Sequence, residues 1–319
     1  MELVRNYSMT TKDLNDGYST LRIVQVGCGG TGSYIVPSIC QYISTSPLKN
    51  KTEIILIDGD IIEQKNLVRQ RFIAQDLGRN KAEVLAERYS NAFGVTVKSL
   101  SEYLDVEKHR GLLSGNSNYY PLIVIGAVDN HNARLQIASL VSGHLHYAMC
   151  IDTGNGMWNG QVNLYTNRPF GYLNERHFSG DTRKPIPGGI ISRLYIPPPM
   201  FQDFALMEKT VTDFLITDQC AVNAEANTQT INANMLSAQC AVSYLYQILS
   251  GSVDSFSLYF DAKSGTVRSL PINLTTIGAM YKYPVDNKQK YKDFQQTHRE
   301  NPLFKCAEQA YSAVYGYHY

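Results

Sequence analysis

The chain has 319 residues, 44% of them hydrophobic and 18% charged, so it can bury a sizeable core in one large domain or two smaller ones. Its formal net charge of +1 argues against nucleic acid or an anionic membrane as a main partner, and no apolar run approaches the roughly 18 residues of a membrane-spanning helix. The polar N-terminus does not resemble a signal peptide and the six cysteines are scattered singly, so we predict a reduced, cytoplasmic protein without structural zinc or disulfides.

Strand and helix patterns alternate through the first half of the chain. Strands are predicted at 21–26, 53–57, 96–100, 121–125 and 146–152, and helices at 32–42, 74–93 and 131–142. The strands are nearly unbroken apolar runs, which is typical of strands buried on both faces. This pattern predicts an α/β fold with a doubly wound, mainly parallel sheet.

The second half of the chain has a different pattern. Residues 160–165, 256–260 and 265–270 are rich in β-formers and predict an antiparallel extension of the sheet, and a helix is predicted at 221–249. Residues 167–218 contain RPFGYL, KPIPGG and IPPPM, whose prolines and glycines forbid long regular elements. We expect them to form a long crossover loop or lid. The main domain is predicted at 1–281, with a tail or small helical appendage at 282–319.

A glycine-rich turn follows the first predicted strand. Gly27, Gly29 and Gly32 give G-x-G-x-x-G between a strand and a helix, and Gly30 and Ser33 belong to the same segment. Such glycines permit a tight turn and let backbone N–H groups approach a phosphate at the helix N-terminus. We predict that the turn binds nucleotide phosphates, although glycine turns of this kind also occur where nothing binds.

Acidic residues stand at the ends of two further strands. Asp58 has the position of the carboxylate that binds ribose hydroxyls, which suits NAD as well as ATP. Asp60 follows it, with the capping of a turn as the alternative role. Asp129 comes just after the strand at 121–125 and is a natural Mg²⁺ ligand, since magnesium takes one or two carboxylates besides phosphate oxygens and water. Its alternative role is to cap the next helix.

Two cations indicate a triphosphate. Arg69, within the segment NLVRQ that also contains Asn66 and Gln70, and Lys81 both follow the acid that would bind ribose. A dehydrogenase has no need of them there, whereas they would neutralise the charge that builds on the phosphates as pyrophosphate leaves. Each cation taken singly could be an ordinary surface residue, but together they predict a site for ATP.

These motifs together resemble the ThiF/MoeB/HesA family, the bacterial relatives of ubiquitin-activating enzymes. The resemblance lies in G-x-G-G-x-G-S at 27–33, I-D-G-D at 57–60, N-L-x-R-Q at 66–70, G-x-x-K-A at 78–82 and D-N-x-x-A-R at 129–134. Further segments at 151–162, 218–225 and 264–271 look like the ThiF-type proteins of mobile elements.

The resemblance implies a homodimer that adenylates the C-terminal carboxylate of a ubiquitin-like protein or peptide, with a conjugating enzyme as a further partner. It implies that Asp58 binds ribose, that Asn66, Arg69 and Lys81 bind the phosphates, and that Asp129 binds Mg²⁺. The C-x-x-C pairs of the sulfur-transfer branch are missing, so zinc is not expected. The family's N-terminal R-Y-x-R-Q segment is also missing, which leaves Arg5 as the only N-terminal candidate to reach a partner subunit's site.

Cys220 is the candidate acceptor of the acyl group. It precedes a predicted helix, at the place where activating enzymes carry their thiol, and a helix N-terminus favours the reactive thiolate. The residues after it are unusually polar for a core helix, as a wet or substrate-facing surface would explain; they include Gln229 and Asn234. The alternative is a small buried side chain, which is our interpretation of Cys28 and Cys240.

Two other functions stay open. A Rossmann-fold oxidoreductase that uses NAD(P) is compatible with the glycine turn and Asp58, but Arg69, Lys81 and Asp129 argue against it. A non-catalytic scaffold with the same fold would not need so complete a set of nucleotide-binding residues.

Overall fold

The computed structural model describes residues 21–114, 121–142, 144, 148–166, 229–250 and 253–271. The predictions for Arg5, Cys220, the segment 167–218 and the tail 282–319 lie outside these residues. Among the helices in the described ranges, none combines the length and the apolar character that crossing a bilayer requires.

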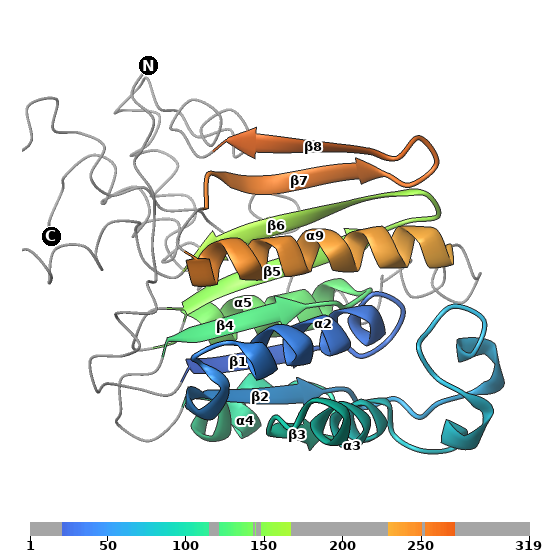
Figure 1. The fold of residues 1–319 in the computed structure, drawn as a ribbon, viewed down its shortest axis with the longest axis vertical. Helices are drawn as coiled ribbons and strands as arrows, with labels where there is room; N and C mark the ends of the chain where they lie inside the picture. Colours follow the sequence, from blue (N-terminus) through green and yellow to red (C-terminus); the bar gives the residue numbers. More distant parts are fainter. Residues whose placement is uncertain are drawn as a thin grey trace, which may run out of the picture.

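An eight-stranded sheet forms the centre of the fold (Figure 1). Its order is β3-β2-β1-β4-β5-β6-β7-β8, with parallel pairing from β3 to β5 and antiparallel pairing from β5 to β8. The strands are β1 (Leu21–Val26), β2 (Thr52–Ile57), β3 (Val97–Leu100), β4 (Leu122–Gly126), β5 (Ala148–Asn155), β6 (Asn159–Thr166), β7 (Ser255–Asp261) and β8 (Thr266–Pro271). The predicted parallel sheet and its antiparallel extension are therefore confirmed.

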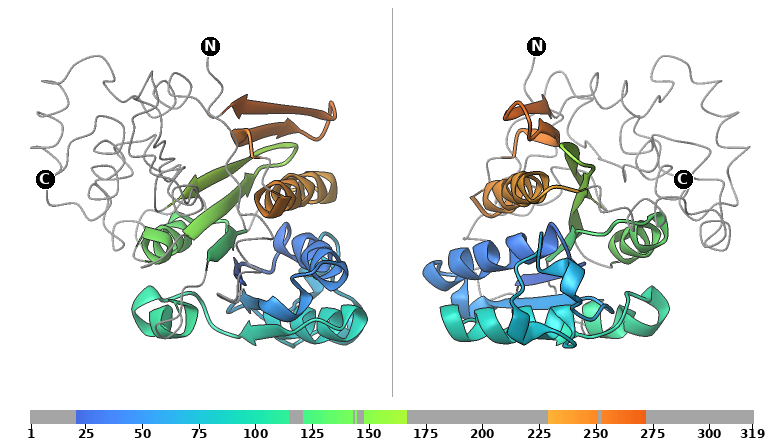
Figure 2. Two further views of the ribbon diagram at one scale, coloured as in Figure 1. Left: turned by 60° about the vertical axis from the view of Figure 1, so that its left-hand side comes forward. Right: turned by 90° about the vertical axis from the view of Figure 1, so that its right-hand side faces the viewer.

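Helices cover both faces of the sheet (Figure 2). One face carries α2 (Gly32–Thr45), α3 (Lys81–Phe93) and α9 (Ile231–Ser250), and the other carries α4 (Val106–Ser114) and α5 (His131–Ser142). Short 3-10 helices occur at η1 (Lys49–Lys51), η2 (Gln64–Asn66) and η3 (Ala74–Asp76). The layers are those of a doubly wound α/β fold.

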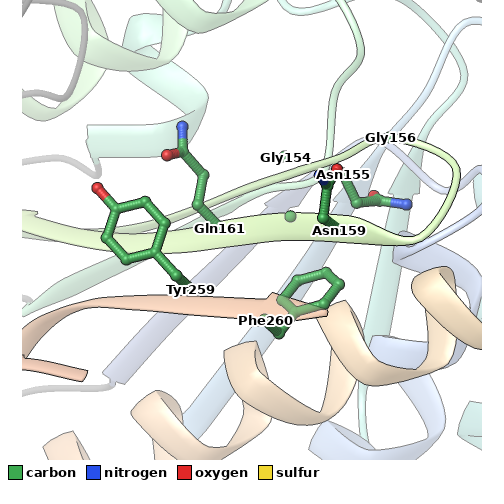
Figure 3. A pocket seen from close by; sticks show the side chains of 8 residues that line it. Gly154, Asn155, Gly156, Asn159, Gln161, Tyr259 and Phe260 are labelled. Atoms are coloured by element: carbon green, nitrogen blue, oxygen red, sulfur yellow. The ribbon is translucent and has the colours of Figure 1, made fainter. Parts of the chain in front are cut away.

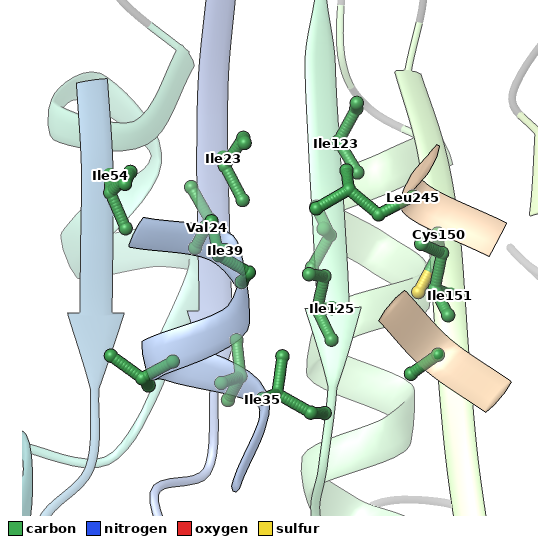
Figure 4. Close-up of a cluster of buried hydrophobic side chains, with 14 of the residues drawn as sticks. Ile23, Val24, Ile35, Ile39, Ile54, Ile123, Ile125, Cys150, Ile151 and Leu245 are labelled. Carbon is green, nitrogen blue, oxygen red and sulfur yellow. The ribbon is translucent and has the colours of Figure 1, made fainter. Parts of the chain in front are cut away.

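The core consists mainly of branched aliphatic side chains between the sheet and the helices (Figure 4). Ile23 and Val24 are adjacent in β1 and both are fully buried, so both faces of this strand are covered. Ile35 and Ile39 of α2 and Leu245 of α9 are buried in the same cluster. Each such side chain contributes about 1.5–3 kcal/mol through its removal from water, which holds the glycine turn between β1 and α2 in a rigid frame.

Two helices begin later than the sequence pattern predicts. The helix predicted from residue 74 begins at Lys81, because the carboxylate of Asp76 closes a 3-10 turn and Gly78 has a positive φ of 79°. The continuous helix predicted at 221–249 is wrong at residues 229–230, which are not helical; residues 221–228 lie outside the described ranges. The described helix begins at Ile231, where Thr230 accepts a hydrogen bond from the N–H of Ala233 in the first turn. The pattern also misses α4, a short helix with few apolar residues.

Asn80 determines where α3 begins and how it is attached to the sheet. Its Oδ1 accepts hydrogen bonds from the N–H groups of Ala82 (2.9 Å) and Glu83 (3.1 Å). Its Nδ2 donates to the carbonyl oxygens of Asp58 (2.8 Å) and Asp60 (3.1 Å). One side chain therefore joins the helix to the turn after β2, and it sets the position of the first helical residue.

We expect Asn80→Ala to lower the free energy of unfolding by about 2 kcal/mol, since it removes a helix cap and the side-chain donor to the buried carbonyl of Asp58. Urea denaturation followed by circular dichroism measures this change. Asn91→Ala, on the exposed surface of the same helix, is the matched control and should cost no more than about 0.5 kcal/mol. Equal losses in the two variants would contradict the role of Asn80.

Candidate functional site

The glycine turn lies at the point where the strand order of the sheet reverses. From β1 the chain proceeds to β2 and β3 on one side, and β4 and β5 lie on the other side. The N–H of Gly27 donates to the carbonyl of Ile57 (2.9 Å), and the N–H of Ala127 donates to the carbonyl of Val26 (2.8 Å). The turn is thus tied to both neighbouring strands, at the place where open α/β sheets usually bind ligands.

The four glycines of the turn have different surroundings. A Cβ atom at Gly27, which has a φ of +93°, would lie 2.3 Å from the carbonyl oxygen of Ala127. A Cβ at Gly32 would lie 2.1 Å from the carbonyl oxygen of Gly27, and one at Gly30 would lie 2.7 Å from a side-chain nitrogen of α9. At Gly29 the nearest atom would be 3.8 Å away. The fold itself requires three of these glycines, and only Gly29 leaves room beside the backbone.

Ser33 and Gln25 hold the turn in place from within. Ser33 is fully buried; its hydroxyl donates to the carbonyl of Gly30 (3.2 Å) and accepts from the N–H of Arg71 (3.1 Å). Gln25 is also fully buried, and its Nε2 donates to the carbonyls of the first and last glycines of the motif. The sequence motif includes Ser33, whereas the role of Gln25 was missed because a glutamine inside an apolar strand carries no motif.

Asp58 connects the end of β2 to the glycine turn. One carboxylate oxygen accepts from the N–H of Cys28 (2.6 Å) and the other from the N–H of Asp60 (2.8 Å). The side chain is buried, with 8% of its surface exposed. Burial raises the pKa of Asp58, against the opposing charge of Lys81 and the two N–H hydrogen bonds.

The raised pKa of Asp58 predicts the sign of a pH effect. The unfolded carboxyl group titrates near its ordinary pKa of 3.8 and the folded one titrates above it, so the folded state retains the proton to higher pH. The contribution of Asp58 to stability, relative to asparagine, is therefore greatest below pH 3.8 and falls as the pH rises through the folded pKa. Urea denaturation of the wild type and of Asp58→Asn at several pH values measures this difference. A difference that grows with pH would contradict the raised pKa.

Lys81 forms an ion pair with Asp60, which follows Asp58 after the end of β2. Its Nζ lies 2.6 Å from Oδ2 of Asp60, and only 7% of its side chain is exposed. The hydroxyl of Tyr103 donates to the other oxygen of Asp60 at 2.5 Å. Although burial alone would raise the pKa of Asp60, the hydrogen bonds from Lys81 and Tyr103 and the charge of Lys81 lower it. The ammonium group therefore has a permanently charged partner at neutral pH.

Tyr103 was not predicted to belong to the site. It follows β3, and its ring lies 2.9 Å from the place that a Cβ at Gly59 would occupy. The hydrogen bond to Asp60, then burial and the charges of Asp60, Asp58 and Asp129 raise the pKa of Tyr103 to about 12. Its position just beyond a parallel strand was the available signal.

Asp129 lies near enough to Tyr103 for its charge, like those of Asp60 and Asp58, to raise the pKa of that phenol. Asp129 is exposed, and the helix cap falls instead to Asn130, whose Oδ1 accepts from the N–H of Ala133 at 2.8 Å. Within the described ranges no group of three or more His, Cys, Asp or Glu residues could hold a metal. Mg²⁺ needs only one or two carboxylates when phosphate oxygens and water complete its shell, so the residues present fit this ion.

Arg69 lies on the other side of the turn, towards α9. Its Nη1 donates to Oε1 of Gln229 at 2.9 Å, while its buried Nε has no acceptor among the described residues. The side-chain oxygen of Asn66 accepts from the N–H of Glu63 (2.8 Å). The main-chain carbonyl of Asn66 accepts from the N–H groups of Arg69 and Gln70. Asn66 thus shapes the segment that presents the guanidinium, and Nε2 of Gln70 comes near Gly29.

Four polar residues, here called the amide cluster, link Arg69 to the glycine turn: Thr31, Asn155, Gln229 and Asn234. Thr31 donates to the side chain of Asn155 (3.0 Å), which in turn donates to the side chain of Asn234 (3.0 Å). Gln229 donates to the carbonyl of Asn155 (3.1 Å). Thr31 and Asn155 lie within the segments 27–33 and 151–162, but those segments did not predict that the four side chains meet. For Gln229 and Asn234 the signal was the polar character of the predicted helix at 221–249.

A cavity of about 540 Å³ lies beside the hairpin between β5 and β6 (Figure 3). In the close-up, Gln161 and Tyr259 point to one side of the sheet and Phe260 points to the other. The cavity shares Asn155 with the amide cluster, so it adjoins the crevice on the β5 side. The full lining is Gly154, Asn155, Gly156, Asn159, Gly160, Gln161, Tyr259 and Phe260.

The four described cysteines are free and buried: Cys28, Cys40, Cys150 and Cys240. Burial raises the pKa of each of them, to about 12 for Cys40 and about 11 for Cys240. They are therefore protonated at neutral pH. The interpretation of Cys28 and Cys240 as packed side chains is confirmed.

Comparison with known proteins gives a family and a shared fold. Residues 4–276 match the profile of the ThiF family, which is most of the chain. Among solved structures, E. coli MccB with succinimide aligns with a TM-score of 0.50 and 16% identity, over 81% of this chain and 66% of that one. E. coli MccB with ATP has a TM-score of 0.48 and 15% identity, over 82% and 66% of the two chains. PaaA has 0.48 and 14%, over 79% and 64%. The chain thus spans just under two thirds of the length of these proteins, and the likeness extends to the fold alone.

Proposed function

Since this chain belongs to the ThiF family, we propose that it uses ATP to adenylate the C-terminal carboxylate of a ubiquitin-like protein or peptide. The observation that carries the proposal is the buried Nε of Arg69, which has no acceptor among the described residues. A buried donor without a partner costs about 1–3 kcal/mol. A phosphate oxygen would satisfy this donor and would also compensate the charge of the guanidinium.

The other residues of the crevice fit the same ligand. Lys81 would contact the phosphates from the opposite side of the glycine turn, and the room beside Gly29 would let a phosphate approach the backbone. Asp58 would accept from ribose hydroxyls, because each carboxylate oxygen has a further lone pair. Asp129 would hold Mg²⁺, which when bound neutralises phosphate charge and orients the triphosphate.

In the proposed reaction a carboxylate oxygen of the partner attacks the α-phosphorus. A new P–O bond forms while the bond to the oxygen bridging to the β-phosphate breaks, and pyrophosphate leaves. Arg69 and Lys81 would stabilise the transition state by neutralising the charge that grows on the departing phosphates. Both side chains are positioned before the ligand binds, so little reorganisation is needed at the moment of reaction.

Cys220 would then accept the acyl group. Its thiolate would attack the carbonyl carbon of the acyl-adenylate, a thioester would form, and AMP would leave. We also propose a homodimer and a conjugating enzyme as a later acceptor. A covalent adduct that a thiol reductant cleaves, present in the wild type and absent from Cys220→Ala, supports the thioester step. If Cys220→Ala keeps full activity and no such adduct forms, the product of the enzyme is the acyl-adenylate and there is no thioester step.

Calorimetric titration tests the choice of nucleotide. Mg·AMPCPP, the α,β-methylene analogue of ATP that cannot be cleaved between its α- and β-phosphates, is expected to bind measurably, and NADH is not. Binding of NADH without AMPCPP would favour the oxidoreductase, because the glycine turn and Asp58 would then serve a dinucleotide. Binding of neither would favour a scaffold.

A further inference from the structure

We infer that Gln229 is a positioning residue for Arg69, with Asn155 as its support. This inference rests on the proposed function, because it assigns Arg69 a phosphate to which its guanidinium is directed. Gln229 uses both ends of its side chain: Oε1 accepts from Arg69 Nη1 at 2.9 Å, and Nε2 donates to the carbonyl of Asn155 at 3.1 Å. The amide therefore connects the guanidinium directly to the main chain at the end of β5.

The main chain of Arg69 is held by the same amide cluster. Nδ2 of Asn234 lies 3.5 Å from the carbonyl oxygen of Arg69, and Asn234 is fully buried against Gly30. Asn155 donates to Asn234 and accepts from Thr31, the residue that precedes α2. The distance between Arg69 and the glycine turn is consequently determined by hydrogen bonds between side chains of this cluster.

The chemistry of its side-chain partner distinguishes Arg69 from four other arginines of the described residues. Arg22, Arg79, Arg88 and Arg134 each form an ion pair with a carboxylate. Arg69 forms no ion pair within the described ranges, and its recorded side-chain partner is a neutral amide. An amide orients the guanidinium without cancelling its charge, so the full positive charge remains for an anionic ligand.

Near-isosteric replacement tests this inference. Gln229→Met removes both hydrogen bonds, so Arg69 must be ordered when the ligand binds, and we expect the dissociation constant of Mg·AMPCPP to rise by about tenfold. The affinity for AMP, which lacks the β- and γ-phosphates, should change by less than about twofold. Gln239→Met, at an exposed position of α9, the helix that follows Gln229, is the matched control and should leave both affinities unchanged.

Two further variants separate positioning from packing. In an Arg69→Ala background, Gln229→Met should cause no additional loss, because the amide acts only through the guanidinium. Gln229→Glu keeps an acceptor for Arg69 but adds a negative charge, so AMPCPP should again bind more weakly; wild-type affinity in this variant would indicate that the hydrogen bond alone matters and would overturn the role assigned to a neutral partner.

The outcomes for the inference and for the proposed function differ. If the wild type binds AMPCPP and folded Gln229→Met binds it equally well, the inference is wrong and the proposed function stands. If the wild type binds no AMPCPP, the proposed function fails and the inference fails with it. Thermal melting of each variant shows whether it is folded, and Gln229→Glu, which preserves the polarity of the site, decides the matter if Gln229→Met does not fold.

Discussion

Lys81→Met should weaken the binding of Mg·AMPCPP by about 100-fold, since it removes a buried cation whose hydrogen bonds to phosphate would be charge-assisted. The change should act on the ligand more than on the fold. Asp60, which loses its partner, is about half exposed and keeps the hydrogen bond from Tyr103, so water can solvate its carboxylate. Calorimetric titration of the two proteins measures the difference.

Lys98→Met is the matched control for this change. Lys98 also pairs with a carboxylate, that of Glu53, but 58% of its side chain is exposed and it lies within β3 rather than beyond the end of a strand. Because exposed ion pairs contribute little to stability, the affinity of the Lys98→Met variant for AMPCPP should stay within about twofold of that of the wild type. Similar affinities for AMPCPP in Lys81→Met and the wild type would remove Lys81 from the proposed site.

Gly27→Ala is expected to destabilise the fold by about 3–5 kcal/mol, from the cost of a positive φ and of a contact that forces the backbone to move. The new Cβ would stand 2.3 Å from the carbonyl oxygen of Ala127, a residue whose N–H is bonded to the carbonyl of Val26 in β1. Gly265→Ala is the control: its φ is +71°, but no atom lies within 4 Å of its Cβ, so strain alone should cost about 1–2 kcal/mol. Urea denaturation measures both, and equal costs would contradict the close approach at Gly27.

Gly29→Ala separates the two roles of the glycine turn. The position has space for a methyl group and no positive φ, so the free energy of unfolding should change by less than about 1 kcal/mol. The same methyl group would stand where a phosphate is proposed to approach the backbone, and AMPCPP should bind about tenfold more weakly. A variant with wild-type affinity would place the phosphates elsewhere.

Much of the architecture was predictable because parallel strands that are buried on both faces must be apolar at nearly every position. The strand predicted at 121–125 and the observed β4 differ by one residue at each end. Helix starts were less predictable. Asn80 and Thr230 cap the first turns of α3 and α9 through side-chain hydrogen bonds, and the periodicity of apolar residues does not reflect such bonds.

The candidate site was predictable only in part, for a related reason. Asp58, Asp129 and the glycine turn follow directly from strand ends, because the carboxyl ends of parallel strands meet at one edge. Tyr103 also follows a strand, but no motif contains it. Arg69 and Gln229 are 160 residues apart in the chain, and their contact depends on how α9 packs against the sheet.

The sequence by itself determined the order of the elements and which strand ends carry acids, cations and glycines, because burial periodicity and turn chemistry are local properties. Only the tertiary structure decided which partner holds each cation: a carboxylate for Lys81 and a neutral amide for Arg69. The physical reason is that these partners come from segments remote in the chain, and the packing of α3 and α9 on one face of the sheet brings them together.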